Sequence, residues 1–320
     1  MASVLSEAYF HDEAAAFAAL EAIVWPNGPT CPHCGAIDRL NRLEGVRSKP
    51  SKKSPEGVVR HGLWKCYHCR GQFTVRKGTV FEASHLELHK WFQAAYLMCS
   101  SQKGVSSNQL HRTLSCTLKT AWFVSHRLRE AMRQGDLAVP FGTGGGAVEA
   151  DETFIGREPG KPKKRAYHHK IKVLSLLDRE TGQARSMVVD DLKPATIVPI
   201  LEENIAKEAR VMTDEAGHYY HLPRHFADHG VVRHGQEEYV NADDRTIHTN
   251  TIEGYFSIFK RGMKGVYQHA SKKHLHRYLA EFDFRYNNRV ALGVNDAERT
   301  TAALKGAVGK RLLYRDSFAG

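Results

Sequence analysis

The chain has 320 residues, of which 42% are hydrophobic, and its 46 Lys and Arg outnumber its 35 Asp and Glu to give a net charge of +11. This length suits two or three domains, and the charge favours a polyanionic partner because Lys and Arg that contact phosphates release condensed counterions. We find no apolar run of about 18 residues and no basic, apolar leader, so we expect no membrane span, no secretory signal and a cytoplasmic protein.

The N-terminal part predicts a short helix followed by a small metal-binding module. Residues 10–24 are alanine-rich with apolar positions at helical spacing, and Pro26 ends the helix. The stretch that follows, to about residue 80, is rich in Gly, Pro, Cys and basic residues and has little periodicity. Inside it, Arg47 to Arg60 is a basic insertion that we expect to be flexible.

Four of the six cysteines form two Cys-x-x-Cys pairs separated by 31 residues. They are Cys31, Cys34, Cys66 and Cys69. Each pair puts two thiolates on a tight turn, and two such turns build the tetrahedral four-sulfur site that suits Zn²⁺. A closed site leaves no position for water, so we expect a structural zinc; redox or chance cysteines are the alternative.

The next segment predicts three helices, and the last two resemble a helix-turn-helix. Residues 85–101, 106–114 and 118–132 carry apolar residues at helical spacing, with a turn near Ser115. Two short helices joined by a tight turn are typical of proteins that bind the DNA major groove, and the basic residue Arg127 lies on the later helix. An ordinary helical hairpin is the alternative.

From Ala147 the pattern becomes α/β, after a glycine-rich stretch (FGTGGG) that we interpret as a linker. The expected strands cover residues 147–155, 170–180, 184–191, 210–214 and 231–234. The expected helices cover residues 194–209, 251–265 and 271–289. The second and third strands are joined by a short turn and predict a hairpin. The last 30 residues show no informative pattern.

Three acidic residues lie at positions where a predicted strand or the end of a predicted element can present a side chain to a common site. Asp151 lies in the first of these strands, Asp214 ends the strand RVMTD, and Glu253 lies in the first turn of a helix. If they converge, their oxygens suit hard cations such as Mg²⁺, and two such ions would clamp the attacking and leaving oxygens of a phosphodiester displacement. Taken singly, each of these acids is more often structural. Glu149, Asp151 and Glu152 are neighbours of which any could be a surface acid, with Glu149 and Asp151 on one face of the strand and Glu152 on the other. Glu253 could instead close a capping box with Asn250.

Basic residues flank these acids in the sequence. Lys260 follows Glu253 by seven residues, or two helical turns, so both side chains lie on the same face of the helix. Lys260 could hold a DNA phosphate there; the alternative is that this face is simply exposed to solvent. We predict DNA contacts from Lys260, Arg261, Lys264, Lys163, Lys164, Arg165 and Arg127. The hairpin around the second cysteine pair predicts a further DNA-backbone surface of Lys65, Arg70, Arg76 and Lys77.

With these motifs the chain resembles the bacterial insertion-sequence transposases that pair an N-terminal zinc ribbon with an ISXO-like catalytic domain. The resemblance covers about residues 15–292 and is carried by the cysteine pairs and by VEADETFIG, VMTDEAGHY, HTNTIEGYFSIFKRGMKGVY and HLHRYLAEFDFRYNNR. It implies an RNase H-like catalytic domain whose three acids are Asp151, Asp214 and Glu253, with Asn250 as an alternative third ligand, and whose following basic residue is Lys260.

The resemblance also implies a DNA transposase that cleaves at terminal inverted repeats and transfers the 3′ ends to target DNA, as a homo-oligomer on DNA. Mg²⁺ or Mn²⁺ would be catalytic and Zn²⁺ structural. A catalytically silent DNA-binding protein and a nuclease without strand transfer are the alternatives. The expected fold class is α/β, divided into an N-terminal helix (1–24), a zinc ribbon (25–82), a helix-turn-helix-like DNA-binding region (83–140), an RNase H-like catalytic domain (146–292) and a C-terminal tail (293–320).

Overall fold

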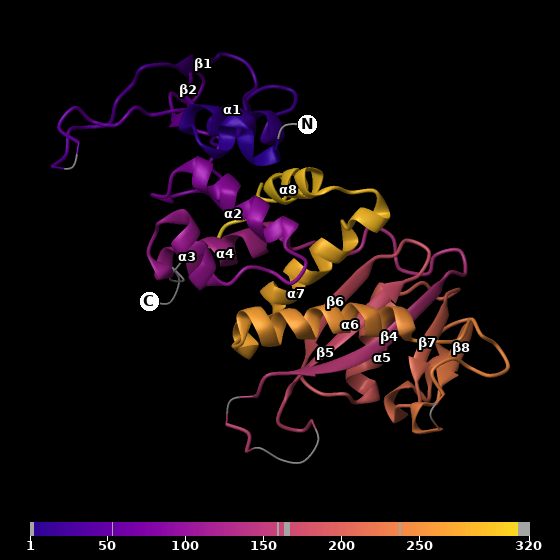
Figure 1. Ribbon diagram of the computed structural model, residues 1–320. Helices are drawn as coiled ribbons and strands as arrows, with labels where there is room; N and C mark the ends of the chain where they lie inside the picture. The colour runs from indigo at the N-terminus through magenta and orange to yellow at the C-terminus, as the bar shows by residue number, and fades with distance from the viewer. Residues whose placement is uncertain (1–2, 53, 159, 163–166, 237, 313–320) are drawn as a thin grey trace. The chain divides into compact units, whose positions relative to one another are not determined.

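The computed structural model describes residues 3–52, 54–158, 160–162, 167–236 and 238–312 (Figure 1). The chain forms two compact units. Unit 1 comprises Met1–Ser101, Val105–Met132 and Asn295–Gly320, and unit 2 comprises Gln102–Gly104 and Arg133–Val294. Across the described residues, every helix is too short or too polar to span a bilayer.

Unit 1 begins with a helix and a small antiparallel sheet in the order β1-β2-β3. The elements are η1 (Val4–Ser6), η2 (Ala8–Phe10), α1 (Glu13–Val24), β1 (Leu40–Leu43), β2 (Leu63–Cys66) and β3 (Gln72–Phe73). Asp12 caps α1, because its carboxylate accepts a hydrogen bond from the Ala15 amide (2.7 Å). Leu40 pairs with Cys66 across β1 and β2, so the sheet carries one cysteine of the second pair.

The basic insertion between β1 and β2 pairs with itself. Arg47 bridges to Val59 and Ser51 to Ser54, both in antiparallel fashion. These contacts satisfy backbone groups of the insertion within the insertion. The segment that we expected to be flexible therefore forms a hairpin-like arm.

Three helices follow in unit 1. They are α2 (Leu88–Ser100), α3 (Ser107–Leu114) and α4 (Leu118–Met132). Ser106 caps α3 by accepting a hydrogen bond from the Gln109 amide (3.1 Å), and Ser115 takes a left-handed φ of 50° between α3 and α4. Helix α3 packs on α4. The expected tight helical pair is present, and its reading of DNA stays a prediction.

Helix α8 (Asp296–Lys305) lies in the segment that we expected to be a tail. Its start is a capping box, in which the Asn295 side chain accepts from the Glu298 amide (3.0 Å) and the Glu298 carboxylate from the Asn295 amide (2.9 Å). Arg299 donates to the carbonyl oxygen of Cys99 in α2 (2.9 Å). The described C-terminal segment is thus a structural part of unit 1.

Unit 2 is built on a five-stranded sheet in the order β6-β5-β4-β7-β8. The strands are β4 (Ala147–Ile155), β5 (Ile171–Asp178), β6 (Ala184–Val189), β7 (Arg210–Asp214) and β8 (Asp228–Val232). β4 and β6 are antiparallel to β5, whereas β7 is parallel to both β4 and β8. Strand β5 therefore runs opposite to the other four, and the expected β5–β6 hairpin is confirmed.

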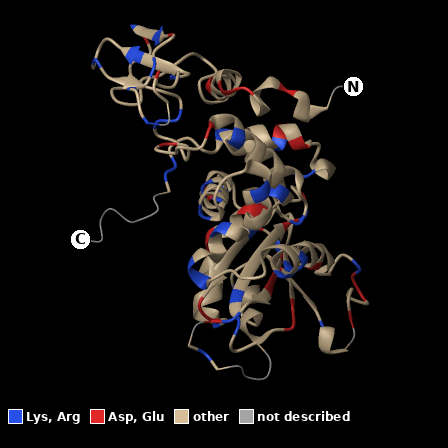
Figure 2. Cartoon of the chain, turned by 60° about the vertical axis from the view of Figure 1, so that its left-hand side comes forward, with Lys and Arg blue, Asp and Glu red and all other residues tan. Residues whose placement is uncertain are grey.

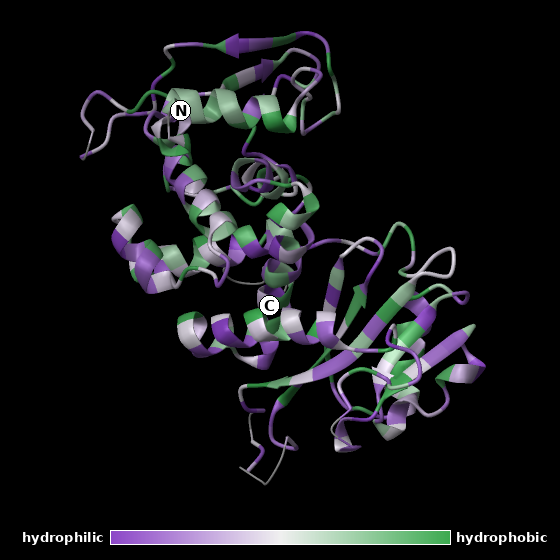
Figure 3. Ribbon diagram, turned by 45° about the vertical axis from the view of Figure 1, so that its right-hand side comes forward, coloured by the Kyte–Doolittle hydropathy of each residue, from purple (hydrophilic) through white to green (hydrophobic). Residues whose placement is uncertain are grey.

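Helices cover both faces of this sheet. They are α5 (Pro194–Asn204) on one face, and α6 (Asn250–Gly262) and α7 (Lys272–Asn287) on the other, with the shorter turns η3 (Gly217–Tyr219), η4 (Leu222–Arg224), η5 (His234–Gln236), the π-helical η6 (Met263–Tyr267) and η7 (Val290–Leu292). Strand β5 is buried along its whole length, with Leu174 facing the α5 core and Val173 the α6–α7 core. Figure 3 shows hydrophobic positions along the central strands.

The glycine-rich stretch is part of unit 2 and does not link two domains. The Phe141 amide donates to the Asn204 carbonyl oxygen (2.9 Å), and the Phe141 side chain is buried in the α5 core. The Gly142 amide donates to Asp178 (2.8 Å) and has a φ of +72°. Glycine suits this position because an added Cβ would lie 2.4 Å from the Cβ of Ala209.

Candidate metal centres and nucleic-acid interface

The four cysteines of the two pairs come together in unit 1. Cys31 Sγ lies 3.7 Å from Cys69 Sγ, and Cys34 Sγ lies 3.7 Å from Cys66 Sγ. All four sulfurs lie within 4.8 Å of one another. A tetrahedral zinc ion with Zn–S bonds of about 2.3 Å separates its sulfurs by about 3.8 Å. The cluster therefore fits the expected structural Zn²⁺.

Each cysteine pair lies on a hydrogen-bonded turn. The Gly35 amide donates to the Cys31 carbonyl oxygen (2.9 Å), and the Cys66 amide donates to the Gly71 carbonyl oxygen (2.9 Å). A hydrogen bond from the Cys69 amide is the main reason that the pKa of the Cys66 thiol is lowered to about 7. The turn thus favours the thiolate form at Cys66, whereas at Cys34 the Ala36 amide is outweighed by burial and the three neighbouring thiols, which raise the pKa to about 12.

Asp151 and Asp214 lie on neighbouring parallel strands of the sheet in unit 2. The register of β4 and β7 pairs Glu149 with Met212. The pairing ends there, and Asp151 and Asp214 each follow two residues further along, on the same face of the sheet. The strand segments that carry these two acids are therefore neighbours in the fold.

A buried glutamate of β4 positions the helix that carries Glu253. Glu149 is fully buried, and its Oε2 accepts a hydrogen bond from the Ile252 amide in the first turn of α6 (2.8 Å). A carboxylate there satisfies a free N–H and meets the positive end of the helix dipole. Asp151 follows Glu149 by two residues and shares its face of the sheet. This contact therefore brings Glu253, the next residue of α6, to the same face as Asp151.

The capping-box alternative for Glu253 is wrong. The N-cap of α6 is Thr249, so Asn250 lies inside the helix. The Thr249 hydroxyl donates to Glu253 Oε1 (3.3 Å), which also lies 3.5 Å from His234 Nε2. The Glu253 side chain keeps 43% of its surface exposed, so a ligand can reach it.

Arg179 ties the start of α6 to the sheet. Its Nε donates to Glu149 Oε1 (2.6 Å), and its other nitrogens donate to the carbonyl oxygens of Thr246 (2.6 Å) and His248 (2.5 Å). Burial and the Arg179 charge lower the pKa of His248. The neutral ring can accept from Arg179 through Nδ1, at 2.9 Å. Sequence reasoning missed Glu149 and Arg179, although strand alternation put Glu149 on the face of Asp151.

The acids of β4, β7 and the start of α6 repel one another. Burial, followed by the charges of Glu152, Asp214 and Glu253, raises the pKa of Asp151 to about 8. Burial also raises the pKa of Asp214, and the charge of Glu152 adds to it. Carboxylates crowded in this way are unfavourable without a counter-charge, and a divalent cation is the strongest one available.

The three acids are near one another without forming a closed set. Across the residues that the structure describes, only the four cysteines gather three or more ligand atoms within 4.8 Å of one another. Asp151 and Asp214 lie on neighbouring strands, while Glu253 is held toward Thr249 and His234. The face is an open arrangement, unlike the cysteine site.

Glu152 points to the opposite face from Asp151 and is only 5% exposed at its side chain. Its Oε1 lies 2.6 Å from His218 Nε2 and accepts a hydrogen bond from the Tyr219 hydroxyl. Both partners belong to η3, which follows Asp214 closely in the chain. Glu152 thus ties the segment after Asp214 to β4. From the sequence, Glu152 could be a surface acid, but in the structure its side chain is buried and structural. The signal in the sequence was the pair His218-Tyr219, which follows Asp214 closely and supplies its hydrogen-bond partners.

Basic residues occur in both units (Figure 2). Lys260 and Arg261 lie in the last turn of α6, and Lys264 follows in η6. Lys260 Nζ lies 5.6 Å from the centre of the Phe256 ring, whereas Arg261 and Lys264 are exposed. The predicted contacts Lys163, Lys164 and Arg165 lie outside the described residues.

The prediction that Arg127 contacts DNA is wrong. Arg127 is 4% exposed, and its guanidinium donates to the carbonyl oxygens of Glu82 (2.9 Å) and Leu312 (3.2 Å). It also packs on the Phe123 ring at 4.7 Å. Burial lowers the pKa of Arg127 to about 10. Its hydrogen bonds serve the interior of unit 1 instead of a ligand.

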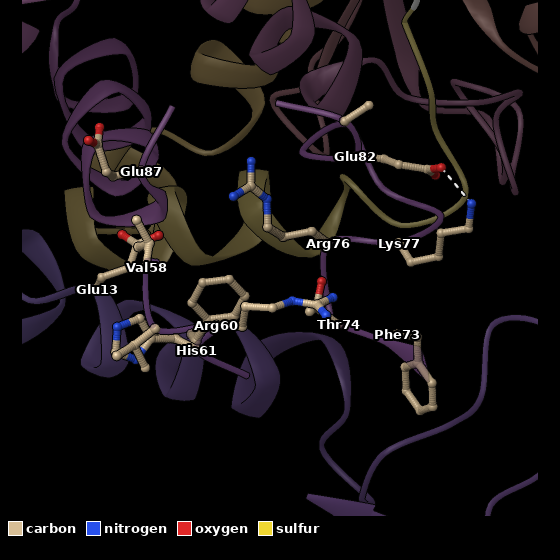
Figure 4. A pocket seen from close by; sticks show the side chains of 13 residues that line it. Glu13, Val58, Arg60, His61, Phe73, Thr74, Arg76, Lys77, Glu82 and Glu87 are labelled. Atoms are coloured by element: carbon tan, nitrogen blue, oxygen red, sulfur yellow. Dashed lines mark hydrogen bonds and ion pairs between the residues drawn. The ribbon is translucent and has the colours of Figure 1, made fainter. Parts of the chain in front are cut away.

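Arg76, expected on a DNA-facing hairpin, also turns inward. It donates to the carbonyl oxygens of Phe81 (3.2 Å) and Ser84 (2.6 Å). It lines a cavity of about 580 Å³ in unit 1, where Lys77 pairs with Glu82 at 2.7 Å (Figure 4). The charged lining is Glu13, Glu82, Glu87, Arg60, Arg76 and Lys77. Acids balance bases there, so the cavity does not suit an anion.

Two known domain families match segments of the chain, one within each unit. Residues 11–72 match the transposase zinc-ribbon domain, and residues 144–287 match the ISXO2-like transposase domain. The chain belongs to the insertion-sequence transposases. The first match contains all four cysteines of the transposase, and the second contains Asp151, Asp214 and Glu253. The resemblance seen in the sequence is confirmed, and DNA is the partner on which a transposase acts.

A relative from Halobacterium salinarum supports this membership. It is described as an uncharacterized protein in transposable element ISH50. It is 28% identical to this transposase over 288 residues, which cover 83% of this chain and 88% of the relative. The similarity therefore extends over most of both chains.

Proposed function

We propose that this transposase cleaves DNA at the terminal inverted repeats of its element and transfers the freed 3′ ends to target DNA, with Asp151, Asp214 and Glu253 as the catalytic acids. One observation carries this assignment. Burial is the main cause of the raised pKa of Asp151, about 8, and after the charge of Glu152 the charges of Asp214 and then of Glu253 add to it. Acids that sense one another in this way are placed to share cations.

Mg²⁺ or Mn²⁺ fits this group of residues. All three side chains offer carboxylate oxygens, which hard divalent cations prefer. Their mutual repulsion is relieved by positive charge. When bound, a pair of such ions stabilises the charge on the attacking and leaving oxygens of an in-line displacement at phosphorus.

The remaining residues of the site hold the acids and the DNA. Glu149 and Arg179 fix the start of α6 and hence Glu253. Glu152 orders the chain after Asp214. Lys260, two helical turns beyond Glu253, binds a DNA phosphate. The same site serves an attack by water in cleavage and an attack by the freed 3′-hydroxyl in strand transfer.

We assign unit 2 to the RNase H-like fold that the family resemblance implies. The order β6-β5-β4-β7-β8 with only β5 reversed supports this, as do the helices on both faces. Two of the acids then belong to adjacent parallel strands at the centre of the sheet. An element with two equivalent ends also favours a symmetric homo-oligomer on DNA.

The test uses the full-length protein with MgCl₂ or MnCl₂ and DNA that carries the sequences flanking its gene. Cleavage followed by joining is expected. Asp214→Asn should reduce cutting to background while end binding stays within a few-fold. The exposed Asp243→Asn serves as a matched control and should cut normally.

Other outcomes decide between the alternatives. Cleavage without joining would identify a nuclease. Binding without cleavage, equal in the native protein and Asp214→Asn, would identify a DNA-binding protein with a silent catalytic unit. Normal cutting by Asp214→Asn would remove this residue from the site.

A further inference from the structure

The imidazole of His234 faces the carboxylate of Glu253 in unit 2. His234 Nε2 lies 3.5 Å from Glu253 Oε1 and 3.4 Å from the hydroxyl oxygen of Thr249. The same hydroxyl donates to Glu253 Oε1 (3.3 Å). The His234 side chain is 33% exposed and that of Glu253 43%, so a ligand can reach both. The two side chains thus form an open pair of donor atoms beside the first turn of α6.

We propose that His234 binds a divalent cation together with Glu253, through Nε2, and so adds a nitrogen ligand to the acids of this transposase. This inference rests on the proposed function, since it takes Glu253 as a cation ligand. It also narrows the class of cation. Imidazole is a ligand of transition ions, whereas Mg²⁺ prefers oxygen ligands, so this part of the site favours Mn²⁺ over Mg²⁺.

The sheet brings His234 to the end of β7 that carries Asp214. Strands β7 and β8 are parallel, so their carboxyl ends lie at the same edge of the sheet. Asp214 pairs with Val232, the last residue of β8, and His234 follows two residues later. Ligands of open α/β sheets bind outside such carboxyl ends. The position of His234 in the fold is therefore one where a ligand is expected.

Glu215, the residue after Asp214, holds the turn that presents His234. Its two carboxylate oxygens accept hydrogen bonds from the backbone amides of His234 (2.8 Å) and Gly235 (2.7 Å), at the start of η5. These bonds fix the backbone of His234 without using its imidazole. The chain after Asp214 and the turn that carries His234 are thus joined, which keeps a donor atom in place for a metal ion.

The separation of His234 and Glu253 suits an ion shared between them. A histidine and a glutamate that bond directly are closer, as in His225 Nδ1 and Glu202 Oε1 at 2.9 Å. With metal–ligand bonds of about 2.1 Å, two ligands of one ion lie about 3.0–3.5 Å apart. The distance of 3.5 Å between His234 Nε2 and Glu253 Oε1 falls at the upper end of this range.

Another pair in unit 2 shows a cation at a similar separation. His248 Nδ1 lies 3.4 Å from Glu149 Oε1, and Arg179 donates to both atoms, at 2.9 and 2.6 Å. In the part of the chain that the structure describes, no lysine or arginine pairs with His234 or Glu253. An added cation can therefore take the place that the guanidinium has at the other pair.

The test is the spectrum of Mn²⁺ bound to the full-length, zinc-loaded protein without DNA. Pulsed EPR detects an imidazole nitrogen bound to Mn²⁺ through its coupling to the electron spin. We expect this coupling in the native protein and its loss in His234→Gln. Mn²⁺ binding should weaken by about tenfold or more in this variant, since even partners behind the ligands contribute that much. Mg²⁺ binding should change much less, because it does not depend on the imidazole.

Two further variants complete the experiment. His225→Gln is the matched control, because His225 is 31% exposed and pairs with a glutamate of α5. It should keep the nitrogen coupling and the native affinity for Mn²⁺. Glu253→Gln changes the other ligand of the pair and should weaken Mn²⁺ binding independently of any effect of His234→Gln on folding.

The inference is overturned by a native protein without nitrogen coupling, by coupling that persists in His234→Gln, or by native Mn²⁺ affinity in Glu253→Gln. If one of these occurs while Asp214→Asn still abolishes cutting, only the role of His234 as a ligand fails. If the Mn²⁺ results are as expected but Asp214→Asn and Glu253→Gln cut normally, the ion is bound and the proposed catalytic acids fail instead.

Discussion

The four carboxylates of β4 and β7 fall into two kinds, according to what faces them. Glu149 meets the Arg179 guanidinium, and Glu152 meets a histidine ring and a tyrosine hydroxyl. Asp151 and Asp214 instead accept backbone amides, from Glu152 (2.6 Å) and Ala216 (3.0 Å). A carboxylate that already pairs with another side chain of the protein has a structural role, because its charge is compensated within the fold. Those without a cationic side chain retain the capacity to bind an added cation.

We predict that Glu149→Gln lowers the free energy of unfolding by about 3 kcal/mol, since breaking a buried pair leaves Arg179 without its counter-charge. Urea denaturation of the full chain measures this change. The exposed Glu203→Gln should stay within about 0.5 kcal/mol of the native protein. Equal stability of the two variants would show that the Glu149–Arg179 contact does not hold α6.

At the scale of elements, one aspartate joins two helices to the sheet. Asp283 of α7 accepts hydrogen bonds from the amide (2.7 Å) and hydroxyl (2.8 Å) of Ser186 in β6 and from the hydroxyl of Tyr255 in α6 (2.5 Å). This contact locks α6 and α7 onto the same edge of the sheet. The placement of α6, and with it Glu253, therefore depends on α7 as well as on Glu149.

Burial raises the pKa of Asp283 to about 6 from an ordinary value of 3.8. The native state therefore holds this proton more tightly than the unfolded chain. The stability that the residue contributes is complete below pH 4 and is lost as the pH rises through 6. We predict that the unfolding free energy of the native protein, relative to Asp283→Asn, falls by roughly 2 kcal/mol between pH 4 and 7.

Urea unfolding at several pH values measures this difference. The exposed Asp243→Asn should show no such trend relative to the native protein. The difference in unfolding free energy between the native protein and Asp283→Asn could instead stay constant or rise with pH. That result would mean that the Asp283 side chain is ionised throughout.

At the scale of the whole molecule, the chain builds two units with different sources of stability. Unit 2 has large apolar cores on both faces of its sheet. The cysteine module in unit 1 has a small core around Cys31, Cys66 and Phe73, so bound metal must supply much of its stability. All four tryptophans (Trp25, Trp64, Trp91 and Trp122) belong to unit 1, so their fluorescence reports that unit alone.

We predict that Cys66→Ser loses the bound zinc and shifts the tryptophan-detected unfolding to lower urea, because three thiolates bind the ion less tightly than four. Element-end binding should weaken as well. Cys116→Ser is the matched control, since Cys116 lies outside the cluster, and it should retain one zinc per chain. Full zinc content in Cys66→Ser would contradict the four-sulfur site.

The sequence by itself determined the features that depend on local spacing. The cysteine pairs identified the zinc module, because a metal site needs its ligands on tight turns. Helical and strand periodicity placed most elements of unit 2, and the strand-end position singled out Asp214. Element positions and family motifs together named Asp151 and Glu253, whose catalytic role stays a prediction.

Only the tertiary structure decided which charged side chains face inward. Arg127 and Arg76 look like DNA contacts in sequence, yet each meets backbone carbonyl oxygens of distant segments. Glu152 looks like a surface acid, yet η3 packs over it. The return of α8 to unit 1 was equally invisible. Periodicity encodes which face of an element is apolar, whereas the partner of a polar group depends on which remote segment packs against it.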